Sequence, residues 1–205
     1  MEDVLDLYEE PYDPKRPVVC FDETTKQLTA SKRPAIPGKP GHPQRHDYEY
    51  ERNGTRNLLM SFEPLRGWRH VQVTQHRKFQ DFAHRMKWLV DEAYPDADAV
   101  RLVVDNLNTH RPASMYETFE PAEARRISKR LEFHYTPKHG SWLNMAEIEF
   151  SVFARQCLDR RIPDEQTLKR EIRALELQRN KAGAAVNWRF TSSDARIKLH
   201  RLYPS

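Results

Sequence analysis

The sequence predicts one α/β domain in which a mixed β-sheet is covered by helices. Two short runs of apolar and β-branched residues, VVCF at 18–21 and VRLVV at 100–104, have the composition of buried strands. Other stretches carry apolar residues three and four positions apart, as amphipathic helices do. The 205 residues, 38% of them hydrophobic, suffice for a single hydrophobic core. Strands that alternate with helices in this way predict a sheet with helices on its faces.

The first third of the chain is expected to contain strands and one long loop. Residues 1–17 are acidic and rich in proline, so we expect the tail of a linker there and the domain itself at residues 18–205. The first strand, 18–21, is expected to stop at the polar residues 22–25. The Pro-rich, basic segment 31–46 predicts a loop. Asn53-Gly54 lies between two strand-like segments and predicts a two-residue hairpin turn, followed by a strand at 68–74.

The remainder is mostly helical. Residues 77–93 predict an amphipathic helix that ends before Pro95. A buried strand at 100–104 ends at Asp105-Asn106, helical segments follow from Pro112, and a short strand is expected at 131–135. The last third predicts a helix capped by Ser141 and reaching residue 158, a second helix opened by residues 163–165, and a short final helix near 193–201.

Composition excludes several classes of protein. No apolar run approaches the roughly 18 residues of a membrane span. The two cysteines, Cys20 and Cys157, cannot build a disulfide framework, and the start of the chain shows no secretory signal, so we expect a reducing, cytoplasmic setting. The 34 Lys and Arg residues against 30 Asp and Glu give a net charge of +4, which is compatible with a nucleic-acid partner without identifying one.

Acidic residues follow two of the predicted buried strands. Asp22 comes after the first strand and Asp105 after the second, and ligands of α/β sheets bind at the carboxyl ends of strands. Either Glu147 or Glu149 on the following helix could complete an oxygen-lined site, because both flank apolar side chains on a helical wheel. Such a site suits Mg²⁺, and a pair of ions about 3.5 to 4 Å apart is typical of phosphoryl transfer. The alternative is that acidic residues fall at strand ends by chance, as turn formers.

Other charged residues allow two interpretations, as ligand-binding groups or as groups that face solvent. His42 and His46 have the spacing of zinc ligands on a helix, but they lie in a Pro-rich loop, so we do not expect a zinc site. Two basic runs could follow DNA phosphates or face solvent; they are Lys32, Arg33, Lys39 and Arg45, and Arg125, Arg126, Lys129 and Arg130. A third group is expected to form a solvated helix face, comprising Lys169, Arg170, Arg173, Arg179 and Lys181.

Three blocks of the sequence resemble the signature blocks of a known family. They are CFDET at 20–24, VVDNLNTH at 103–110 and TPKHGSWLNMAEIEFS at 136–151. In this order they are similar to those of bacterial insertion-sequence transposases of the mariner-like superfamily, nearest the branch called insertion sequence six-thirty. The resemblance covers nearly the whole chain. It implies an RNase H-like fold and a DDE transposase, an enzyme that cuts and rejoins transposon DNA with divalent cations.

The resemblance also assigns roles to residues. Asp22, Asp105 and Glu147 match the three catalytic, metal-binding acids, so it selects Glu147 over Glu149. Met145 departs from the proline found in many relatives, and 41 residues separate Asp105 from Glu147, a longer spacing than usual that we place in the helical stretch 121–130. Supporting or DNA-contacting roles are expected for Asn106, His110, Lys138, His139, Ser141 and Asn144. Trp142 is expected in the core or in a wall of the site, and Glu23 at a solvated strand end.

The implied biology is cut-and-paste DNA transposition in a bacterial cytoplasm, with the protein associated with the nucleoid when bound to DNA. The resemblance implies two Mg²⁺ or Mn²⁺ ions, double-stranded transposon ends and a TA dinucleotide target as partners, and a homodimer in a synaptic complex. Family members carry an N-terminal helix-turn-helix region, which we expect to be absent before Asp22. The alternatives are an inactive remnant that binds DNA non-specifically and a stand-alone RNase H-like nuclease.

Overall fold

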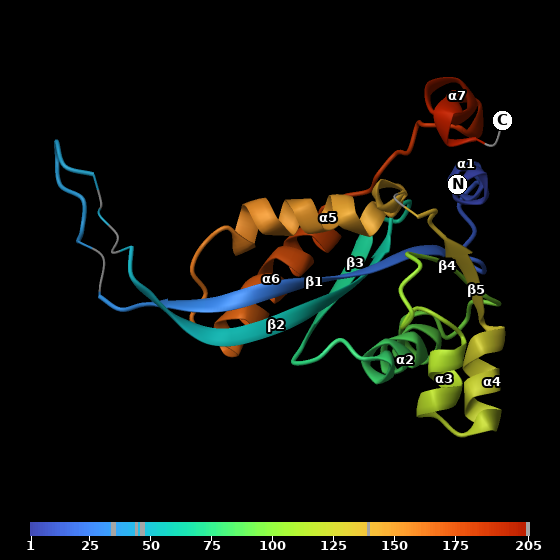
Figure 1. Cartoon of the computed structure of the whole chain (residues 1–205), viewed down its shortest axis with the longest axis horizontal. Coiled ribbons are helices and arrows are strands. Elements are labelled where there is room, and N and C mark those ends of the chain that lie inside the picture. Colours follow the sequence, from blue (N-terminus) through green and yellow to red (C-terminus); the bar gives the residue numbers. More distant parts are fainter. Residues whose placement is uncertain (34–35, 44, 46–47, 139, 204–205) are drawn as a thin grey trace.

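The computed structural model describes residues 1–33, 36–43, 45, 48–138 and 140–203. Within these residues the strands form one five-stranded mixed sheet in the order β3-β2-β1-β4-β5, shown in Figure 1. β2 is antiparallel to β1 and β3, whereas β1, β4 and β5 are mutually parallel. The strands are β1 (Val18–Ser31), β2 (Tyr50–Glu63), β3 (Trp68–Thr74), β4 (Val100–Val104) and β5 (Leu131–Tyr135).

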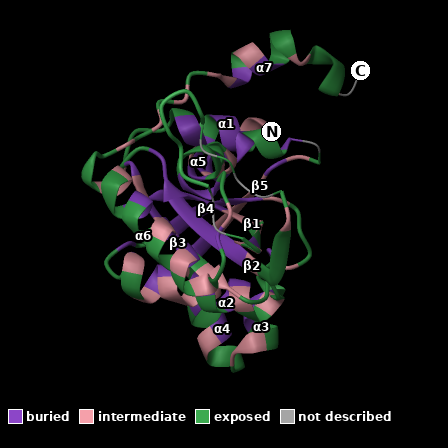
Figure 2. Cartoon of the chain, turned by 90° about the vertical axis from the view of Figure 1, so that its left-hand side faces the viewer, coloured by how far each residue is buried: buried purple, intermediate pink, exposed green. Residues whose placement is uncertain are grey.

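Helices cover both faces of the sheet, and Figure 2 shows the buried residues gathered on the strands and the inner sides of the helices. They are α1 (Glu2–Glu9), α2 (Phe79–Trp88), α3 (Ala113–Thr118), α4 (Pro121–Lys129), α5 (Met145–Phe153), α6 (Glu165–Lys181) and α7 (Ser192–Lys198). Two stretches of π-helix, η1 (Leu89–Ala93) and η3 (Ala154–Leu158), extend α2 and α5, and short 3₁₀ turns are η2 (Ser141–Leu143) and η4 (His200–Leu202).

Two apolar clusters fill the two sides of the sheet because successive side chains of a strand point to opposite faces. On β1, Val18 and Cys20 pack in the cluster that includes residues of α1, α5 and α6. Val19 and Phe21 pack in the other cluster, with residues of α2, α3 and α4. The mixed sheet with helices on both faces is the predicted α/β architecture.

The start of the chain differs from the expected linker tail. Residues 2–9 form helix α1, and its side chains Val4, Leu5, Leu7 and Tyr8 are buried in the first cluster. The Tyr8 hydroxyl donates a hydrogen bond to the backbone oxygen of Leu143, 2.7 Å away. Apolar residues at helical spacing made this segment part of the core, a pattern that its acidic residues and prolines concealed.

The first strand is longer than predicted, and the expected hairpin at Asn53-Gly54 is wrong. β1 continues to Ser31 and pairs with β2 from Cys20, opposite Phe62, to Ser31, opposite Tyr50. Between Gln27 and Thr29 the register shifts, and Gly54, with a φ of 87°, lies there on β2. Glycine at positive φ suits a β-bulge as well as a hairpin turn, so the same dipeptide serves a continuous strand. The paired strands extend away from the body in Figure 1.

Helix α6 covers the edge strand β3. The Glu176 carboxylate accepts a hydrogen bond from the backbone N–H of Val71 at 2.9 Å. Asn180 pairs with both backbone groups of Arg69, accepting from its N–H and donating to its oxygen, each at 2.8 Å. Side chains thus occupy backbone groups that an open edge would offer to another strand.

Most of the remaining elements follow the predictions, with one correction at α5. The strands at 68–74, 100–104 and 131–135 and the helices opened near residues 79 and 165 are confirmed. The N-cap of α5 is Asn144 rather than Ser141, because residues 141–143 form a 3₁₀ turn first. Among the described residues, no helix combines the length and apolar character needed to cross a membrane.

Candidate active site

The site begins where the parallel strands β1 and β4 separate. Their pairing ends at Cys20 opposite Val103. Asp22 lies two residues further along β1, and Asp105 follows directly after the last residue of β4. Both aspartates therefore lie near the carboxyl-terminal end of the parallel pair, which is the usual place for ligands in α/β sheets. β1 itself does not end there, contrary to the prediction, because β2 continues to pair with it.

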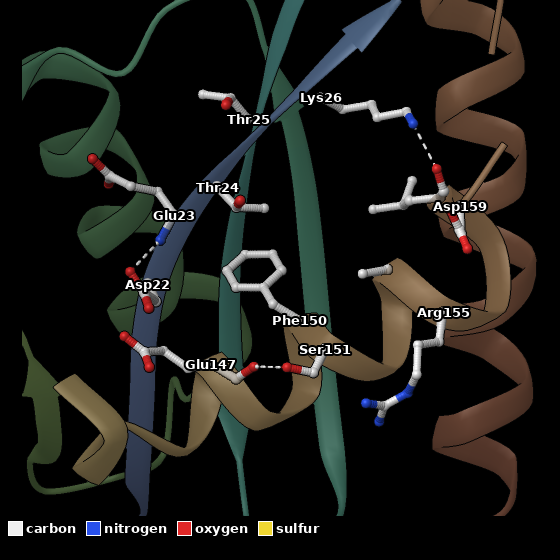
Figure 3. A pocket seen from close by; sticks show the side chains of 12 residues that line it. Asp22, Glu23, Thr24, Thr25, Lys26, Glu147, Phe150, Ser151, Arg155 and Asp159 are labelled. Carbon is white, nitrogen blue, oxygen red and sulfur yellow. Dashed lines mark hydrogen bonds between the residues drawn. The ribbon is translucent and has the colours of Figure 1, made fainter. Parts of the chain in front are cut away.

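Glu147 approaches the same region from helix α5. Asp22 shares the face of β1 with Cys20, and that face packs against α5. Figure 3 shows the carboxylates of Asp22 and Glu147 side by side at one end of an open cavity of about 740 Å³. The structure thus brings Glu147 to the first predicted acid.

The electrostatics of Asp22 show that the three acids share one environment. Burial, together with the carboxylates of Asp105 and Glu147, raises the pKa of Asp22 to about 7, although the backbone N–H of Glu23 and the His110 ring act in the opposite direction. The Glu23 N–H donates to Oδ1 of Asp22 at 2.7 Å. A bound cation would stabilise the charged form of a carboxylate whose pKa is raised in this way.

His110 lies completely buried between two carboxylates. Its Nδ1 donates to Oδ1 of Asp105 at 2.5 Å and its Nε2 to Oε2 of Glu23 at 3.0 Å. Burial alone would lower the pKa of His110, yet these two hydrogen bonds raise it to about 9. The same contact lowers the pKa of Asp105 in spite of that residue's partial burial. A hydrogen bond from His110 therefore stabilises the charged form of Asp105, and Asp22 lacks such a partner.

Glu23 differs from the expectation of a solvated strand end. Its side chain is only 6% exposed and lies on the face of β1 opposite to Asp22, against His110. The sequence did not predict the contact between Glu23 and His110, because β1 was expected to stop before Glu23. The alternation of Val19, Phe21 and Glu23 toward one face is the signal that would have placed this carboxylate among buried groups.

Glu149 has a structural role that separates it from Glu147. Its carboxylate is 1% exposed and forms ion pairs with Arg69, at 3.0 Å, and with Arg179, at 2.5 Å. Arg69 comes from β3 and Arg179 from α6, so the two ion pairs of Glu149 join α5 to both of these elements. The helical wheel left both glutamates open, and the structure places only Glu147 in the cavity beside Asp22.

Two asparagines hold the loops of the site. Asn144 caps α5 by accepting from the backbone N–H of Ala146 at 3.2 Å, and its Nδ2 donates to the oxygen of Phe21 at 2.8 Å. The start of the Glu147 helix is thereby tied to the residue before Asp22. Asn106 donates to the oxygen of Thr136, which joins the segment after β4 to the segment after β5.

The other expected contact residues are more dispersed. Lys138 and Ser141 are exposed on the turn before α5, and His139 and His46 lie outside the described residues. Trp142 is 40% exposed and stacks on Trp188 with ring centroids 6.2 Å apart, so it is neither a core residue nor a lining residue of the cavity. A neighbouring aromatic partner on the C-terminal segment, which the sequence did not reveal, explains this position.

Part of each basic group is engaged in ion pairs within the chain. On α4, Arg126 binds Asp91 and Glu123. Just after α4, Arg130 donates to backbone oxygens of Tyr94 and Pro95. On α6, four of the expected solvated residues are paired with acids; they are Lys169, Arg170, Arg173 and Arg179. Lys32 pairs with Glu49 at 3.6 Å on the β1–β2 extension, where Lys39 and Arg45 are exposed.

The cavity continues well beyond the acids. It is lined on one side by residues 22–26 of β1 and on the other by residues at helical spacing on α5 and η3, from Glu147 through Phe150 to Leu158. The twelve residues from Glu147 to Leu158 span eleven steps of about 1.5 Å, so this wall is roughly 16 Å long. Arg155 lies along it and is exposed, and no described residue pairs with its guanidinium. Lys26 instead donates to backbone oxygens of Leu158 and Arg160.

The donor chemistry of the site fits a hard divalent cation. Asp22, Asp105 and Glu147 supply carboxylate oxygens, the ligands that Mg²⁺ and Mn²⁺ prefer, and the pKa of Asp22 is raised by burial and by the other two carboxylates. Across the described residues, no three His, Cys, Asp or Glu side chains already converge as a closed set of ligands. The three acids are neighbours that have not drawn together around a common point.

Comparisons with known proteins identify a family and several similar folds. The family described as DDE superfamily endonuclease matches residues 17–169. None of the curated proteins matches the chain. Among solved structures, the Mos1 mariner paired-end complex with Mn and the Mos1 paired-end complex with the left transposon end are each 14% identical, with TM-scores of 0.58 and 0.59. The Mos1 strand transfer complex is 12% identical, with a TM-score of 0.54.

These similarities extend over most of the chain but only part of its neighbours. The alignments cover 88%, 88% and 92% of this chain, and 55%, 55% and 62% of the Mos1 chains. The chain thus spans little more than half the length of those proteins. At this level of identity the likeness is one of fold, and it confirms the predicted α/β, RNase H-like architecture.

Proposed function

Because the chain belongs to the DDE superfamily endonucleases, we propose that it is the catalytic domain of a transposase that cuts and rejoins DNA at Asp22, Asp105 and Glu147. The observation that carries this assignment is geometric: Asp22 and Glu147 line the same end of the cavity, and Asp105 follows β4, the parallel neighbour of the strand that carries Asp22. The paired-end and strand-transfer complexes of Mos1 support DNA as the partner.

The three acids are proposed to hold two Mg²⁺ or Mn²⁺ ions. When bound, such ions polarise a phosphodiester and make an attacking water or hydroxyl more acidic. Under this proposal, Asp22 and Asp105, from the neighbouring strands β1 and β4, and Glu147, from α5 beside Asp22, hold and orient the ions. The presence of Mn in a Mos1 complex supports this choice of ions.

The long cavity suits a strand of nucleic acid beside the acids. Its wall of roughly 16 Å matches several nucleotides at about 3.4 Å per residue of a strand. Phe150 and Ala154 offer an apolar surface, while Arg155 offers a cation to a phosphate. Under this proposal the scissile phosphate lies at the Asp22 end and the strand follows α5 toward Arg155.

Finer features are also part of the proposal. They are membership of the insertion sequence six-thirty branch, insertion at TA dinucleotides, a homodimeric synaptic complex, and a cytoplasmic, nucleoid-associated location. The domain assignment to residues 18–205 is extended to include α1, since its apolar side chains belong to the same core.

Nicking of supercoiled plasmid by the purified protein, in Mg²⁺, Mn²⁺ or EDTA, tests the proposed function. We expect metal-dependent nicking that is lost in Asp22→Asn, Asp105→Asn and Glu147→Gln. Asp159→Asn is the matched control, because Asp159 lines the same cavity at its far end. Nicking that survives the three substitutions would refute the site. A folded protein that binds duplex DNA with a steep salt dependence but never nicks it would favour the DNA-binding remnant, and preference for an RNA–DNA hybrid would favour the RNase H-like nuclease.

A further inference from the structure

Glu23 contacts both aspartates of the proposed site, one through its backbone and one through His110. Its backbone N–H donates to Oδ1 of Asp22 at 2.7 Å. Its side chain accepts from His110, whose other ring nitrogen donates to Oδ1 of Asp105. We propose that the side chains of Glu23 and His110 are positioning residues that set the orientation of Asp105 for divalent-cation binding, while the backbone N–H of residue 23 holds Asp22. This inference rests on the proposed function.

The pattern of hydrogen bonds leaves one oxygen of each aspartate for a ligand. On Asp105, both His110 and the backbone N–H of Leu107 donate to Oδ1, at 2.5 and 3.3 Å. On Asp22, the donor is also directed to Oδ1. Within the described part of the chain, the hydrogen bonds recorded for these two carboxylates all involve Oδ1, so each Oδ2 is available to a cation. Outer partners of this kind fix the orientation of a ligating carboxylate.

The hydrogen bonds that run from Glu23 through His110 to Asp105 form a relay, and neighbouring groups hold it in place. The His110 ring is fully buried and packs against Phe21 and Phe82, with ring centroids 5.3 and 4.9 Å away. The Tyr135 hydroxyl donates to the His110 backbone oxygen at 3.0 Å, which fixes the loop that carries the ring. Because neither ring nor loop is free to turn, the position of Glu23 on β1 is transmitted to Asp105.

A purely stabilising role would not require this chemistry. Replacing buried ionic groups by apolar ones of similar volume is often neutral or stabilising, so a buried Glu–His pair is weak evidence for stability alone. The pair here ends on Asp105, a carboxylate that is 31% exposed at the site. The side chains of Glu23 and His110 therefore act on a proposed ligand.

Mn²⁺ binding to the purified protein separates positioning from stability. The variants are Glu23→Ala, His110→Ala, their combination, and the conservative Glu23→Gln, which keeps an acceptor for His110. Calorimetry or electron paramagnetic resonance gives the Mn²⁺ dissociation constant, and nicking at saturating Mn²⁺ gives the rate. We expect each alanine variant to weaken Mn²⁺ binding about 10- to 100-fold, the range typical of outer-sphere partners. Glu23→Gln should recover most of the loss.

The double variant and a control outside the site make the test specific. Because the two residues act in one relay, the combined loss should be close to that of the weaker-binding single variant rather than the product of both. Glu63→Gln is the control, since Glu63 is a buried carboxylate bonded by Tyr94 away from the site. It should lower stability without changing the Mn²⁺ dissociation constant.

The outcomes distinguish the two proposals. If wild-type protein binds Mn²⁺ and nicks DNA while Glu23→Ala and His110→Ala bind Mn²⁺ within twofold of it, the positioning role is wrong and the proposed function stands. Equal weakening in Glu63→Gln would reduce the effect to general destabilisation and also overturn the inference. If the wild-type protein binds no Mn²⁺, the proposed function itself is wrong.

Discussion

Replacing Glu149 by glutamine is expected to destabilise the protein strongly, whereas the same change at Glu147 is expected to leave its stability almost unchanged. The two residues are two positions apart on α5, so they point to different faces of the helix, and they are chemically identical. Glu149 is buried between Arg69 and Arg179, and Arg69 is itself fully buried. Glu147 lies in the cavity near another carboxylate, Asp22. The contrast tests which glutamate belongs to the fold and which to the site.

The magnitude follows from the charge that would be left unpaired. Breaking a buried ion pair by removing one partner typically costs about 3–5 kcal/mol. Arg69 keeps hydrogen bonds to the backbone oxygens of Gly67 and Ala184, so we expect the lower end, about 3 kcal/mol. For a domain of this size each kcal/mol lowers the melting temperature by about 2–4 °C, which gives a decrease of about 6–12 °C.

Urea denaturation followed by circular dichroism, in EDTA at neutral pH, measures the difference. Glu147→Gln should unfold within about 0.5 kcal/mol of wild type, or be slightly more stable, because it removes a charge near Asp22. Equal midpoints for wild type and Glu149→Gln would refute the structural role of Glu149. A large loss in Glu147→Gln would show that this residue also holds the fold together.

Three further predictions address the charge, the cavity and the backbone. In EDTA, the contribution of Asp22 to stability should fall as pH rises from about 4 to 7, because folded Asp22 keeps a proton, up to its pKa of about 7, that the unfolded chain releases near pH 4. A urea midpoint with the same pH profile in wild type and in Asp22→Asn would contradict this. Arg155→Ala should weaken DNA binding and reduce the salt slope by about one in fluorescence anisotropy, whereas Arg170→Ala, on α6, should not; equal slopes would exclude a phosphate contact. Gly67→Ala should lower the melting temperature far more than Gly183→Ala. Both residues have positive φ, which costs an alanine about 1–2 kcal/mol, but only at Gly67 would the added Cβ clash, 2.6 Å from a backbone carbon. Similar melting temperatures for the two variants would show that the backbone at Gly67 shifts to accept the Cβ.

The order of strands and helices could be predicted from local patterns, but the extent of individual elements could not. The buried runs at 18–21 and 100–104 and the helical spacing at 77–93 depend on neighbours in sequence, and they reappear as β1, β4 and α2. The continuation of β1 to Ser31 depends on pairing with β2, which no property of residues 22–31 reveals. Gly54 was assigned to a turn because glycine at positive φ is required by turns and bulges alike.

The sequence predicts the part of the site that lies at the ends of buried strands. Asp22 and Asp105 follow from their places after buried runs. The distinction between Glu147 and Glu149 does not follow from the helix that carries both, because it is made by Arg69 and Arg179 on distant elements. Family resemblance selected Glu147 from its motif, and the structure supplies the physical reason why Glu149 is committed elsewhere.

Three consecutive residues of β1 connect the whole site, which gives the long strand a functional reason. The Phe21 oxygen binds Asn144 and so places the helix of Glu147, Asp22 is itself one of the acids, and Glu23 reaches Asp105 through His110. A slip of one residue in the pairing of β1 would exchange the faces of Asp22 and Glu23. The ladder with β2 continues well past the acids, and each added pair makes that slip more costly. A strand that stopped at residue 22 would leave the orientation of the two acids to a few pairs alone.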